Sequence, residues 1–332
     1  MLSKFPRNAL ARRLFLAAPV LGIMATGPVR AQRIQRPVRV GFLSPARPTD
    51  SDLQQLRLGL GQLGWIEGRD YVIRARFANL DPQVLPGLLD QLLQEGIDVL
   101  VTHGAATRVV PEAQRSVPVV FSFSGDPVAA SYVRSMAKPG GNATGNSQLM
   151  WELVGKRIQL LREIAPAARR TLVVQSPDHP GETEERQRTQ SAAADLGLEL
   201  VIRPVKDRAA LDSALNDGTA AGCDSLLCFT DSVTIANRQV IAGYARQMRI
   251  PSVFPRREFC EAGGLISYGP NFPALISQLA RFVEQIAAGV RPADIPIEWP
   301  TVIETVINNR TATETGISIP LNVMARANEL IE

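Results

Sequence analysis

The sequence predicts an α/β protein with two units, each built on a parallel sheet. Short strands alternate with amphipathic helices from Arg36 onward, and most of these strands are apolar along nearly their whole length. Such strands are typical of parallel sheets covered by helices on both faces. The alternation occurs before and again after the stretch Val117–Gly145, so we expect this stretch to join the units. A chain of 332 residues with 45% hydrophobic residues is long enough for two medium domains.

The first unit is predicted to contain four strands and three helices. The strands are expected at Pro37–Leu43, Tyr71–Phe77, Asp98–Thr102 and Val117–Phe123, and the helices at Leu53–Leu63, Asp81–Glu95 and Ala106–Arg115. Asp81 followed by Pro82 is typical of a helix start, because the carboxylate caps the first turn and proline fits its first position. After its strand, the joining stretch is expected to form a polar loop, a short helix, a glycine-rich turn and an extended segment.

The second unit is predicted to repeat this order. Its strands are expected at Arg170–Gln175, Leu198–Arg203, Asp224–Phe229, Pro251–Phe254, Gly264–Tyr268 and Thr301–Ile307. Its helices are expected at Met150–Ile164, Gly181–Leu196, Asp207–Asn216, Val233–Met248, Arg256–Ala262 and Pro270–Ala288. From Asn308 we expect a helix, a break at Pro320 and a last helix. The acidic residues Glu182, Glu184 and Glu185 are interpreted as a solvated helix start that complements the helix dipole.

The first 31 residues predict an export signal peptide. Arg12 and Arg13 precede a short apolar run, and a cleavage site follows near Ala31–Gln32. The paired arginines followed by Leu-Phe-Leu resemble a twin-arginine signal, with an ordinary Sec signal as the alternative. Either route predicts a protein of the periplasm.

The leader also accounts for the basic balance of the chain. It holds five of the 36 lysine and arginine residues and none of the 32 acidic ones, while the whole chain has a formal charge of +4. The remaining 31 basic and 32 acidic residues nearly cancel. The charge therefore indicates no nucleic-acid partner.

No metal, cofactor or catalytic site is predicted. Cys223, Cys228 and Cys260 are interpreted as small buried apolar residues, and no disulfide is indicated. Two histidines without a Cys-x-x-Cys pair form no zinc-binding pattern, and the sequence has no Gly-x-Ser-x-Gly motif. Residues 59–64 match Gly-x-Gly-x-x-Gly, but they lie at the far end of a predicted helix rather than directly after the first strand, so Gly64 is interpreted as a helix C-cap.

Candidate ligand-binding residues lie in loops that follow the predicted strands. The carboxyl ends of neighbouring parallel strands meet at one edge of a sheet, where open α/β sheets bind their ligands. The candidates from both units are Ser44, His103, Gly104, Ala105, Ser124, Asp126, Asp178, Asp231 and Glu258.

Some of these candidates have a second interpretation. The small residues of His103-Gly104-Ala105 either let backbone N–H groups reach an anion or form only a tight turn. Asp126 and Asp231 either contact a ligand, where a carboxylate would suit an ammonium group, or only cap the following helices. We expect a binding protein rather than an enzyme, because no nucleophile is placed beside a base. An exported α/β hydrolase using His103 is the alternative.

Several longer segments carry a family resemblance. They are LGWIEGRDY (Leu63–Tyr71), FSGDPV (Phe123–Val128), KPGGNATG (Lys138–Gly145) and REFCEAGGLISYG (Arg257–Gly269). In these segments the chain resembles the ABC-transporter substrate-binding proteins of the tryptophan/tyrosine-binding type. The resemblance implies a periplasmic-binding-protein type I fold, in which two Rossmann-like lobes with parallel sheets are joined by hinge crossings and hold a small solute between them.

The resemblance also implies a domain division and partners. Residues 37–145 plus 270–298 would form the first lobe, and residues 146–269 plus 299–332 the second. The implied partners are a small-molecule ligand, such as an amino acid, and an ABC permease in the inner membrane, with a membrane sensor as the alternative and the protein itself a monomer. The family often has Thr- or Ser-rich turns at His103–Ala105 and Asp-Asn at Asp231-Ser232, so the identity of the ligand stays open.

Overall fold

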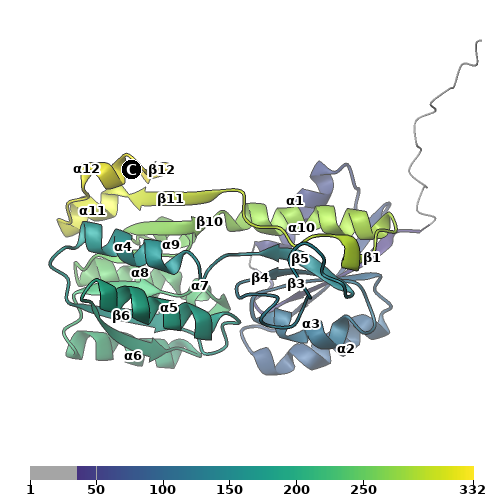
Figure 1. Ribbon diagram of the computed structural model, residues 1–332, viewed down its shortest axis with the longest axis horizontal. Helices are drawn as coiled ribbons and strands as arrows, with labels where there is room; N and C mark the ends of the chain where they lie inside the picture. Colours follow the sequence, from purple (N-terminus) through teal and green to yellow (C-terminus); the bar gives the residue numbers. More distant parts are fainter. Residues whose placement is uncertain (1–35, 50) are drawn as a thin grey trace, which may run out of the picture. The chain divides into compact units, whose positions relative to one another are not determined.

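The computed structural model describes residues 36–49 and 51–332. The export signal expected over residues 1–31 lies outside them. The described chain contains two β-sheets flanked by helices (Figure 1). This confirms the predicted α/β class with two sheets. No helix within residues 36–49 and 51–332 has the length and apolar character needed to cross a bilayer.

The first sheet has the strand order β2-β1-β3-β4-β5, and every neighbouring pair is parallel. Its strands are β1 (Val38–Ser44), β2 (Tyr71–Phe77), β3 (Val99–His103), β4 (Val119–Phe123) and β5 (Ala143–Ser147). Helices α1 (Asp52–Gln62) and α10 (Phe272–Ala287) cover one face. The other face carries the 3₁₀ turn η1 (Pro82–Val84), α2 (Leu85–Gln94), the 3₁₀ turn η2 (Gly104–Val109) and α3 (Val110–Ala113).

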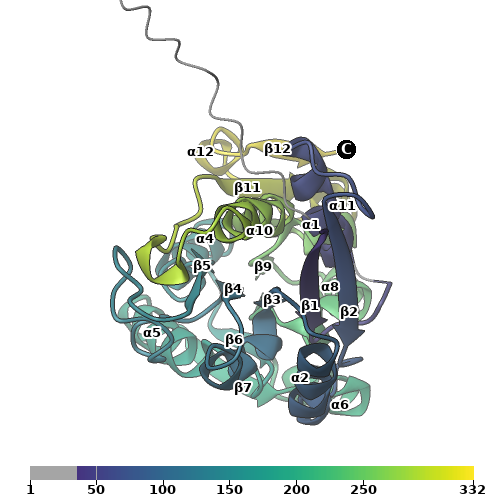
Figure 2. The same ribbon diagram turned by 90° about the vertical axis from the view of Figure 1, so that its right-hand side faces the viewer.

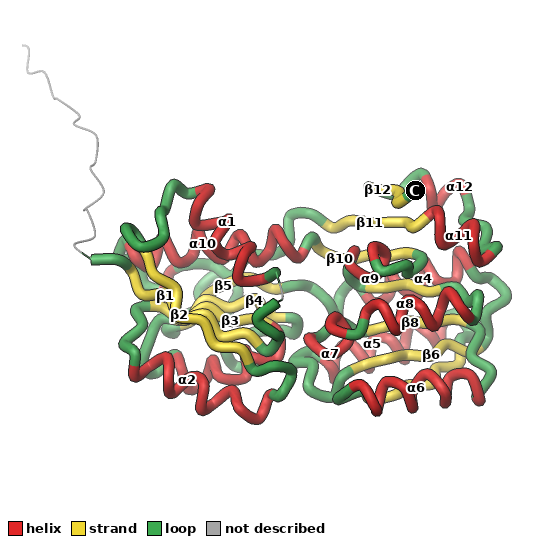
Figure 3. The backbone as a smooth tube through the Cα atoms, turned by 180° about the vertical axis from the view of Figure 1, so that it is seen from behind, coloured by secondary structure: helices red, strands yellow, loops and turns green. Residues whose placement is uncertain are grey.

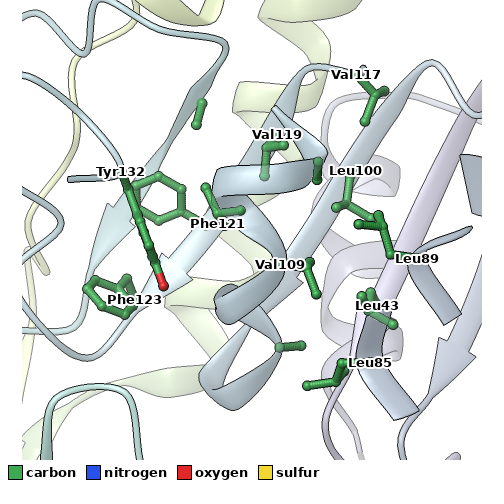
Figure 4. Packing of buried hydrophobic residues seen from close by; sticks show 14 of the residues in the cluster. Leu43, Leu85, Leu89, Leu100, Val109, Val117, Val119, Phe121, Phe123 and Tyr132 are labelled. Carbon is green, nitrogen blue, oxygen red and sulfur yellow. The ribbon is translucent and has the colours of Figure 1, made fainter. Parts of the chain in front are cut away.

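Two hydrophobic clusters hold these helices against the first sheet. Leucines of α1 and phenylalanine and leucine side chains of α10 are buried on one face. On the other face, Leu85 of α2 lies near Leu43 of β1 (Figure 4). Phe121 and Phe123 of β4 meet Tyr132 in the same cluster, with the ring centroids of Phe123 and Tyr132 4.8 Å apart. The segment after β4 is therefore fixed to the sheet by aromatic packing.

The second sheet has the strand order β12-β11-β10-β9-β8-β6-β7. Its strands are β6 (Arg170–Gln175), β7 (Glu199–Pro204), β8 (Ser225–Cys228), β9 (Ser252–Phe254), β10 (Ile266–Pro270), β11 (Ile303–Asn308) and β12 (Glu329–Ile331). The expectation of parallel pairing is wrong for one pair, because β10 and β11 are antiparallel. Strand β10 leads out to α10 beside the first sheet, and β11 leads back, so the two must run in opposite directions.

Helices cover both faces of the second sheet. They are α4 (Val154–Ile164), α5 (Glu182–Asp195), α6 (Arg208–Ala220), α7 (Ser232–Ala236), α8 (Arg238–Gln247), α9 (Arg257–Glu261), α11 (Asn309–Thr315) and α12 (Leu321–Met324), and the 3₁₀ turn η3 (Pro292–Asp294) precedes β11. Side chains of α4 and α5 share one hydrophobic cluster, and those of α6, α8 and α9 share the other. Cys223, Cys228 and Cys260 are buried free thiols, as the sequence predicts.

The described chain crosses between the sheets after β5, between β10 and α10, and between η3 and β11 (Figure 3). The first and last crossings run side by side, because Asn146 forms a parallel bridge with Glu298. The Ser147 N–H donates to the Glu298 carbonyl over 2.9 Å. Gln278 and Arg281 of α10 both donate to the Glu298 carboxylate. Helix α10 is thus bonded to a crossing segment as well as packed on the first sheet.

Three local predictions are wrong. The short helix expected after Asp126-Pro127 is absent from the described residues, where turns follow β4 and the Asp126 carboxylate accepts the backbone N–H groups of Val128 and Ala129. The helix expected over residues 233–248 divides at Asn237, whose side chain donates to the Val233 carbonyl. The last helix shortens to α12, because the chain end instead pairs with β11 as β12.

The Gly-x-Gly-x-x-Gly match serves helix packing and helix termination rather than nucleotide binding. Helices α1 and α10 lie side by side (Figures 1 and 2). A Cβ atom at Gly59 would lie 2.2 Å from the backbone oxygen of Ser277, so only glycine permits this approach. Gly64 has φ +81° immediately after the helix, which fits the predicted C-cap.

A buried ionic group in the second sheet's helices corrects the interpretation of Glu185. Its carboxylate is fully buried and accepts from Arg157 Nη1 and lies against His179 Nε2, each over 2.8 Å. Arg157 also donates to the Met150 carbonyl in the first crossing. Burial acts to raise the pKa of Glu185, but His179 and Arg157 outweigh it and hold the pKa below its usual range. The sequence suggests a solvated acid here because its helix is otherwise polar.

Replacing Gly59 by alanine is expected to destabilise the protein by about 1–3 kcal/mol, because the new methyl group must push α1 away from α10. Gly61 of the same helix has open space around its Cβ position. Gly61→Ala is therefore expected to stabilise the helix by about 0.5–1 kcal/mol. Urea unfolding of both variants measures this, and equal effects would contradict the packing role of Gly59.

Replacing Glu185 by glutamine is expected to lower stability by about 3–5 kcal/mol, because it leaves buried positive charge without its partner. Since the folded pKa of Glu185 is lowered, its stabilising effect is present above the unfolded pKa and is lost as pH falls through the folded value. Glu184→Gln, a change at a partly exposed neighbour, is the control and should stay within about 0.5 kcal/mol. Denaturant midpoints at pH 7 and pH 4 distinguish the two.

Candidate functional site

A cavity of about 210 Å³ lies where loops of both sheets meet. The first sheet contributes the segment after β1, the end of β3 and the start of α10, and the second contributes the segments after β8 and β9. One residue comes from the crossing after β5. The lining residues are Ala46, Thr49, Ser51, Asp52, His103, Gly104, Gln148, Asp231, Ser232, Ile235, Arg238, Arg256, Glu258, Phe272 and Ile276.

His103 and Gly104 line the cavity from the first sheet. His103 ends β3 and is buried, with Nε2 3.5 Å from the Asp52 carboxylate at the start of α1. Its ring also packs near Phe42, with ring centroids 5.7 Å apart. Gly104 has φ +53° at the turn from strand to η2, a conformation that glycine adopts without strain. Strand and turn together fix the position of the imidazole.

Asp231 lines the cavity from the second sheet and also caps α7. Its Oδ1 accepts the backbone N–H groups of Val233 and Thr234, and the Thr234 hydroxyl accepts from the Asp231 N–H, which completes a capping box. Oδ2 is buried and has no hydrogen bond of normal geometry within the described chain. The Ser176 hydroxyl is near enough to the carboxylate to act on its pKa. Burial raises the pKa of Asp231 to about 6, against the opposing effect of His179 and the capping N–H groups.

Arg256 and Glu258 form an ion pair at the wall of the cavity. Their side chains are 13% and 22% exposed. Arg256 also stacks on Phe272, with its guanidinium carbon 4.0 Å from the ring centroid. Burial acts to raise the pKa of Glu258, but Arg256 outweighs this and holds the pKa below its usual range. The pair therefore stays ionised at neutral pH.

Arg238 is a second guanidinium at the cavity. It begins α8 and donates to the Ile235 carbonyl over 2.9 Å. Among the ion pairs of the described residues it has no carboxylate partner within 4.0 Å. The cavity thus holds a paired set, Arg256 with Glu258, beside the separate charges of Arg238 and Asp231.

Five predicted site residues lie outside the lining. Ser44 is buried and accepts the Ala46 N–H over 3.1 Å, and Ala105 is buried in η2. The Ser124 hydroxyl is buried without a hydrogen bond among the described groups. Asp126 caps the turn after β4, and Asp178 pairs with Arg108 over 3.0 Å.

Ser124 and Asp178 nevertheless belong to a direct contact between loops of the two sheets. A Cβ atom at Gly181 would lie 3.1 Å from the Cα of Gly125 and 3.2 Å from the carbonyl carbon of Ser124. Gly181 follows β6 and Gly125 follows β4, and the Arg108–Asp178 ion pair joins η2, which follows β3, to the loop after β6. Backbone meets backbone at this contact.

Several residues that line the cavity are not among the ligand-binding residues predicted from the sequence. Arg238 reaches the cavity because the helix divides at Asn237, which no local pattern announces. Gln148 lies on the crossing and donates to the Ser122 hydroxyl over 3.1 Å. Phe272 enters from α10, far along the chain from the other first-sheet residues. Thr49, Ser51 and Asp52 did have a signal, since they lie in the polar segment that precedes the first helix.

This set of side chains suits recognition rather than chemistry. The cavity contains guanidinium, carboxylate, hydroxyl and amide groups beside the apolar side chains of Ile235, Phe272 and Ile276. Across residues 36–49 and 51–332, no group of three or more His, Cys, Asp or Glu is arranged to hold a metal ion. Fixed charges of both signs in a small cavity match a ligand that itself carries both signs.

Comparison with known proteins places the chain in a family. Residues 48–331 match the family model described as ABC transporter substrate binding protein. The chain is 20% identical over 249 residues to the tyrosine-binding protein of Clostridioides difficile (strain R20291), covering 75% of this chain and 71% of that protein.

Solved structures show the same fold. A conserved domain protein from Vibrio cholerae O1 is 25% identical with a TM-score of 0.81, over 89% of this chain and all of that one. An ABC domain from Streptococcus pneumoniae in complex with L-Trp is 22% identical with a TM-score of 0.78, over 88% of this chain and all of that one. These likenesses confirm the expected periplasmic-binding-protein type I fold. Members of the matched family are solute-binding proteins rather than enzymes, and the chain belongs to this ABC transporter substrate-binding protein family.

Proposed function

We propose that this protein is the exported solute-binding component of an ABC import system and that it binds a small zwitterion, such as an amino acid, in the cavity described above. In this proposal residues 37–145 plus 270–298 form one lobe, residues 146–269 plus 299–332 form the other, and the ligand lies between them. The family membership supports the class of function, and the names of the tyrosine-binding and L-Trp-bound relatives support an amino acid as ligand.

The observation that carries the ligand class is the pair of separate charges in the cavity. Arg238 offers a guanidinium that suits a carboxylate, and Asp231 offers a buried carboxylate oxygen that suits an ammonium group. Asp231 is held in an environment that raises its pKa to about 6. A ligand ammonium group would stabilise the ionised Asp231 carboxylate, which has no cationic partner of this kind among the described residues.

The size of the cavity supports a small solute. Its volume of about 210 Å³ is below the range of roughly 300–1,000 Å³ common for drug-sized ligands. The walls come from loops of both sheets, so a ligand in the cavity would contact both lobes. Binding would then favour the arrangement in which the lobes are together.

The contact between Gly125 and Gly181 supports closure as the mechanism. In our proposal the crossings act as the hinge, and the loops after β4 and β6 separate when the ligand leaves. The Arg108–Asp178 pair is partly exposed, so it steers the approach of the loops more than it stabilises them. Glycine at both positions permits the backbones to touch.

The site and partner assignments follow from the same proposal. Asp52, His103, Gly104, Asp231, Arg238 and Glu258 contact the ligand or hold the groups that do so. Ser44, Ala105, Ser124, Asp126 and Asp178 shape and close the site. The twin-arginine-like leader delivers the monomer to the periplasm, where an ABC permease accepts the ligand.

Thermal-shift screening of an amino-acid library is expected to yield a ligand that stabilises the protein by about 2.7 kcal/mol at 100 times its Kd. Arg238→Ala should weaken that ligand by about 10- to 100-fold, since a hydrogen bond to a charged group contributes about 1.5–3 kcal/mol. Arg246→Ala, on the same helix but outside this cavity, is the control and should bind normally. A folded protein that no library member stabilises would contradict the proposal.

Binding is expected to weaken by about tenfold between pH 7 and pH 5, because protonation of Asp231 below its pKa of about 6 removes the partner of the ammonium group. Asp231→Asn should bind weakly and lose most of this pH dependence, which separates Asp231 from His103 and Asp52 in the same cavity. Asparagine keeps the helix cap. For folding alone the sign is opposite: Asp231 stabilises the protein below the unfolded pKa and loses this effect as pH rises through about 6, so Asp231→Asn should raise Tm at pH 8.

Gly181→Ala tests closure. The residue has φ −106°, which alanine adopts freely, so only the loop after β4 opposes the methyl group. We expect an affinity loss of about tenfold or more, because the closed state becomes less populated, with little change in the Tm of the free protein. Gly155→Ala, with open space at its Cβ position, is the control. Unchanged affinity in Gly181→Ala would rule out closure at this contact, and calorimetric titration measures both variants.

A further inference from the structure

The aromatic surface of the candidate cavity is already occupied by the protein's own side chains. Two ring-bearing residues, Phe272 and His103, are among its lining residues in the described chain. The guanidinium carbon of Arg256 lies 4.0 Å from the centroid of the Phe272 ring. His103 packs near Phe42 and lies beside the Asp52 carboxylate. The Arg256 guanidinium therefore covers one face of the Phe272 ring, and the His103 ring is in contact with Phe42 and Asp52.

The guanidinium over Phe272 is held in place by a second residue. Arg256 Nε donates to Glu258 Oε2 over 3.2 Å, and its Nη2 donates to Oε1, so the pair is bidentate. Both side chains are mostly buried. A bidentate Arg–carboxylate pair has a defined geometry, and an arginine bound in this way does not leave an aromatic face easily.

The remaining space and charge favour a compact ligand. The cavity measures about 210 Å³, and its other apolar surface comes from small or aliphatic side chains, Ala46, Ile235 and Ile276. The separate charges are those of Arg238 and Asp231. An ammonium and a carboxylate group can therefore be matched, while the face of Phe272 on which Arg256 lies is closed to an indole or phenol ring.

We propose that Arg256, held by Glu258 on the face of Phe272, is a specificity-determining residue that restricts the ligand to compact, non-aromatic zwitterions. This inference rests on the proposed function and narrows it: the ligand class differs from the tyrosine and L-tryptophan in the names of the relatives. Removing the guanidinium would uncover the Phe272 ring and enlarge the cavity, so an aromatic side chain could enter.

Isothermal titration of the full chain with two sets of amino acids tests this. The compact set is glycine, L-alanine, L-serine and β-alanine, and the aromatic set is L-phenylalanine, L-tyrosine and L-tryptophan. The wild-type protein is expected to bind at least one compact member and to bind every aromatic member at least 100-fold more weakly. The double variant Arg256→Ala with Glu258→Gln, which leaves no unpaired charge behind, is expected to gain at least tenfold in affinity for an aromatic member.

The control removes an equivalent arginine away from the cavity. Arg188 lies over Trp151 with its guanidinium carbon 4.4 Å from the ring centroid, and neither residue lines the cavity. Arg188→Ala is expected to leave the selectivity unchanged. A melting curve confirms that each variant is folded, and the single variant Arg256→Lys, which retains a cation but loses the planar stack, provides a second measurement with an expected partial gain.

The outcomes separate the two proposals. Tight binding of an aromatic amino acid by the wild-type protein would overturn the specificity inference and support the proposed function. Folded variants that gain no aromatic affinity would also overturn the inference. If the wild-type protein binds no member of either set and no other amino acid, the proposed function fails, and the inference fails with it.

Discussion

The buried interaction of Arg157 with Glu185 and His179 is the constraint on which the second half of the structure depends. It joins α4 to α5 and, through the Met150 carbonyl, to the crossing that follows β5. His179 lies in the loop after β6, the same loop that carries Asp178 and Gly181 to the first sheet's loops. Breaking a buried ion pair is costly. The network therefore keeps the crossing segment after β5 and the loop after β6 in fixed positions relative to each other.

The same network influences the candidate site. The charge of His179 opposes the rise in the pKa of Asp231 that burial causes. Asp231 is at once a helix cap and a cavity residue, because Oδ1 accepts the capping N–H groups and the residue lines the cavity, while Oδ2 is buried. From the sequence, helix capping and ligand contact are equally favoured for Asp231. The structure shows the capping role for Oδ1, and in our proposal Oδ2 binds the ligand.

Close backbone approaches form a second constraint, and they explain glycines that local patterns misassign. Gly59 permits α1 to meet α10, and Gly145 permits β5 to lie against β4, since a Cβ there would lie 1.9 Å from the Phe121 carbonyl oxygen. Gly125 and Gly181 permit loops of the two sheets to touch. A turn, a nucleotide loop and a hinge all use glycine as well, so the residue type alone does not distinguish them.

The sequence by itself determined the order of strands and helices, the type of most elements, and the loops where a site would form. Periodicity and caps such as Asp81 are local properties, and they act within a few residues of where they are read. His103, Gly104, Asp231 and Glu258 were found in this way, since strand ends in a parallel sheet converge.

Tertiary structure alone decided the rest. Glu185 became a buried ion-pair member, Arg238 entered the cavity at a helix break, and Phe272 came from α10 to receive Arg256 on its ring. The antiparallel pairing of β11 followed from the path of the chain between the sheets. Each of these depends on which segments meet in space, and the partners lie from 16 to 41 residues apart in the sequence. The burial of a charge, a break in a helix and the direction of a strand have no local sequence signal, because each depends on a segment that packs against it in the folded protein.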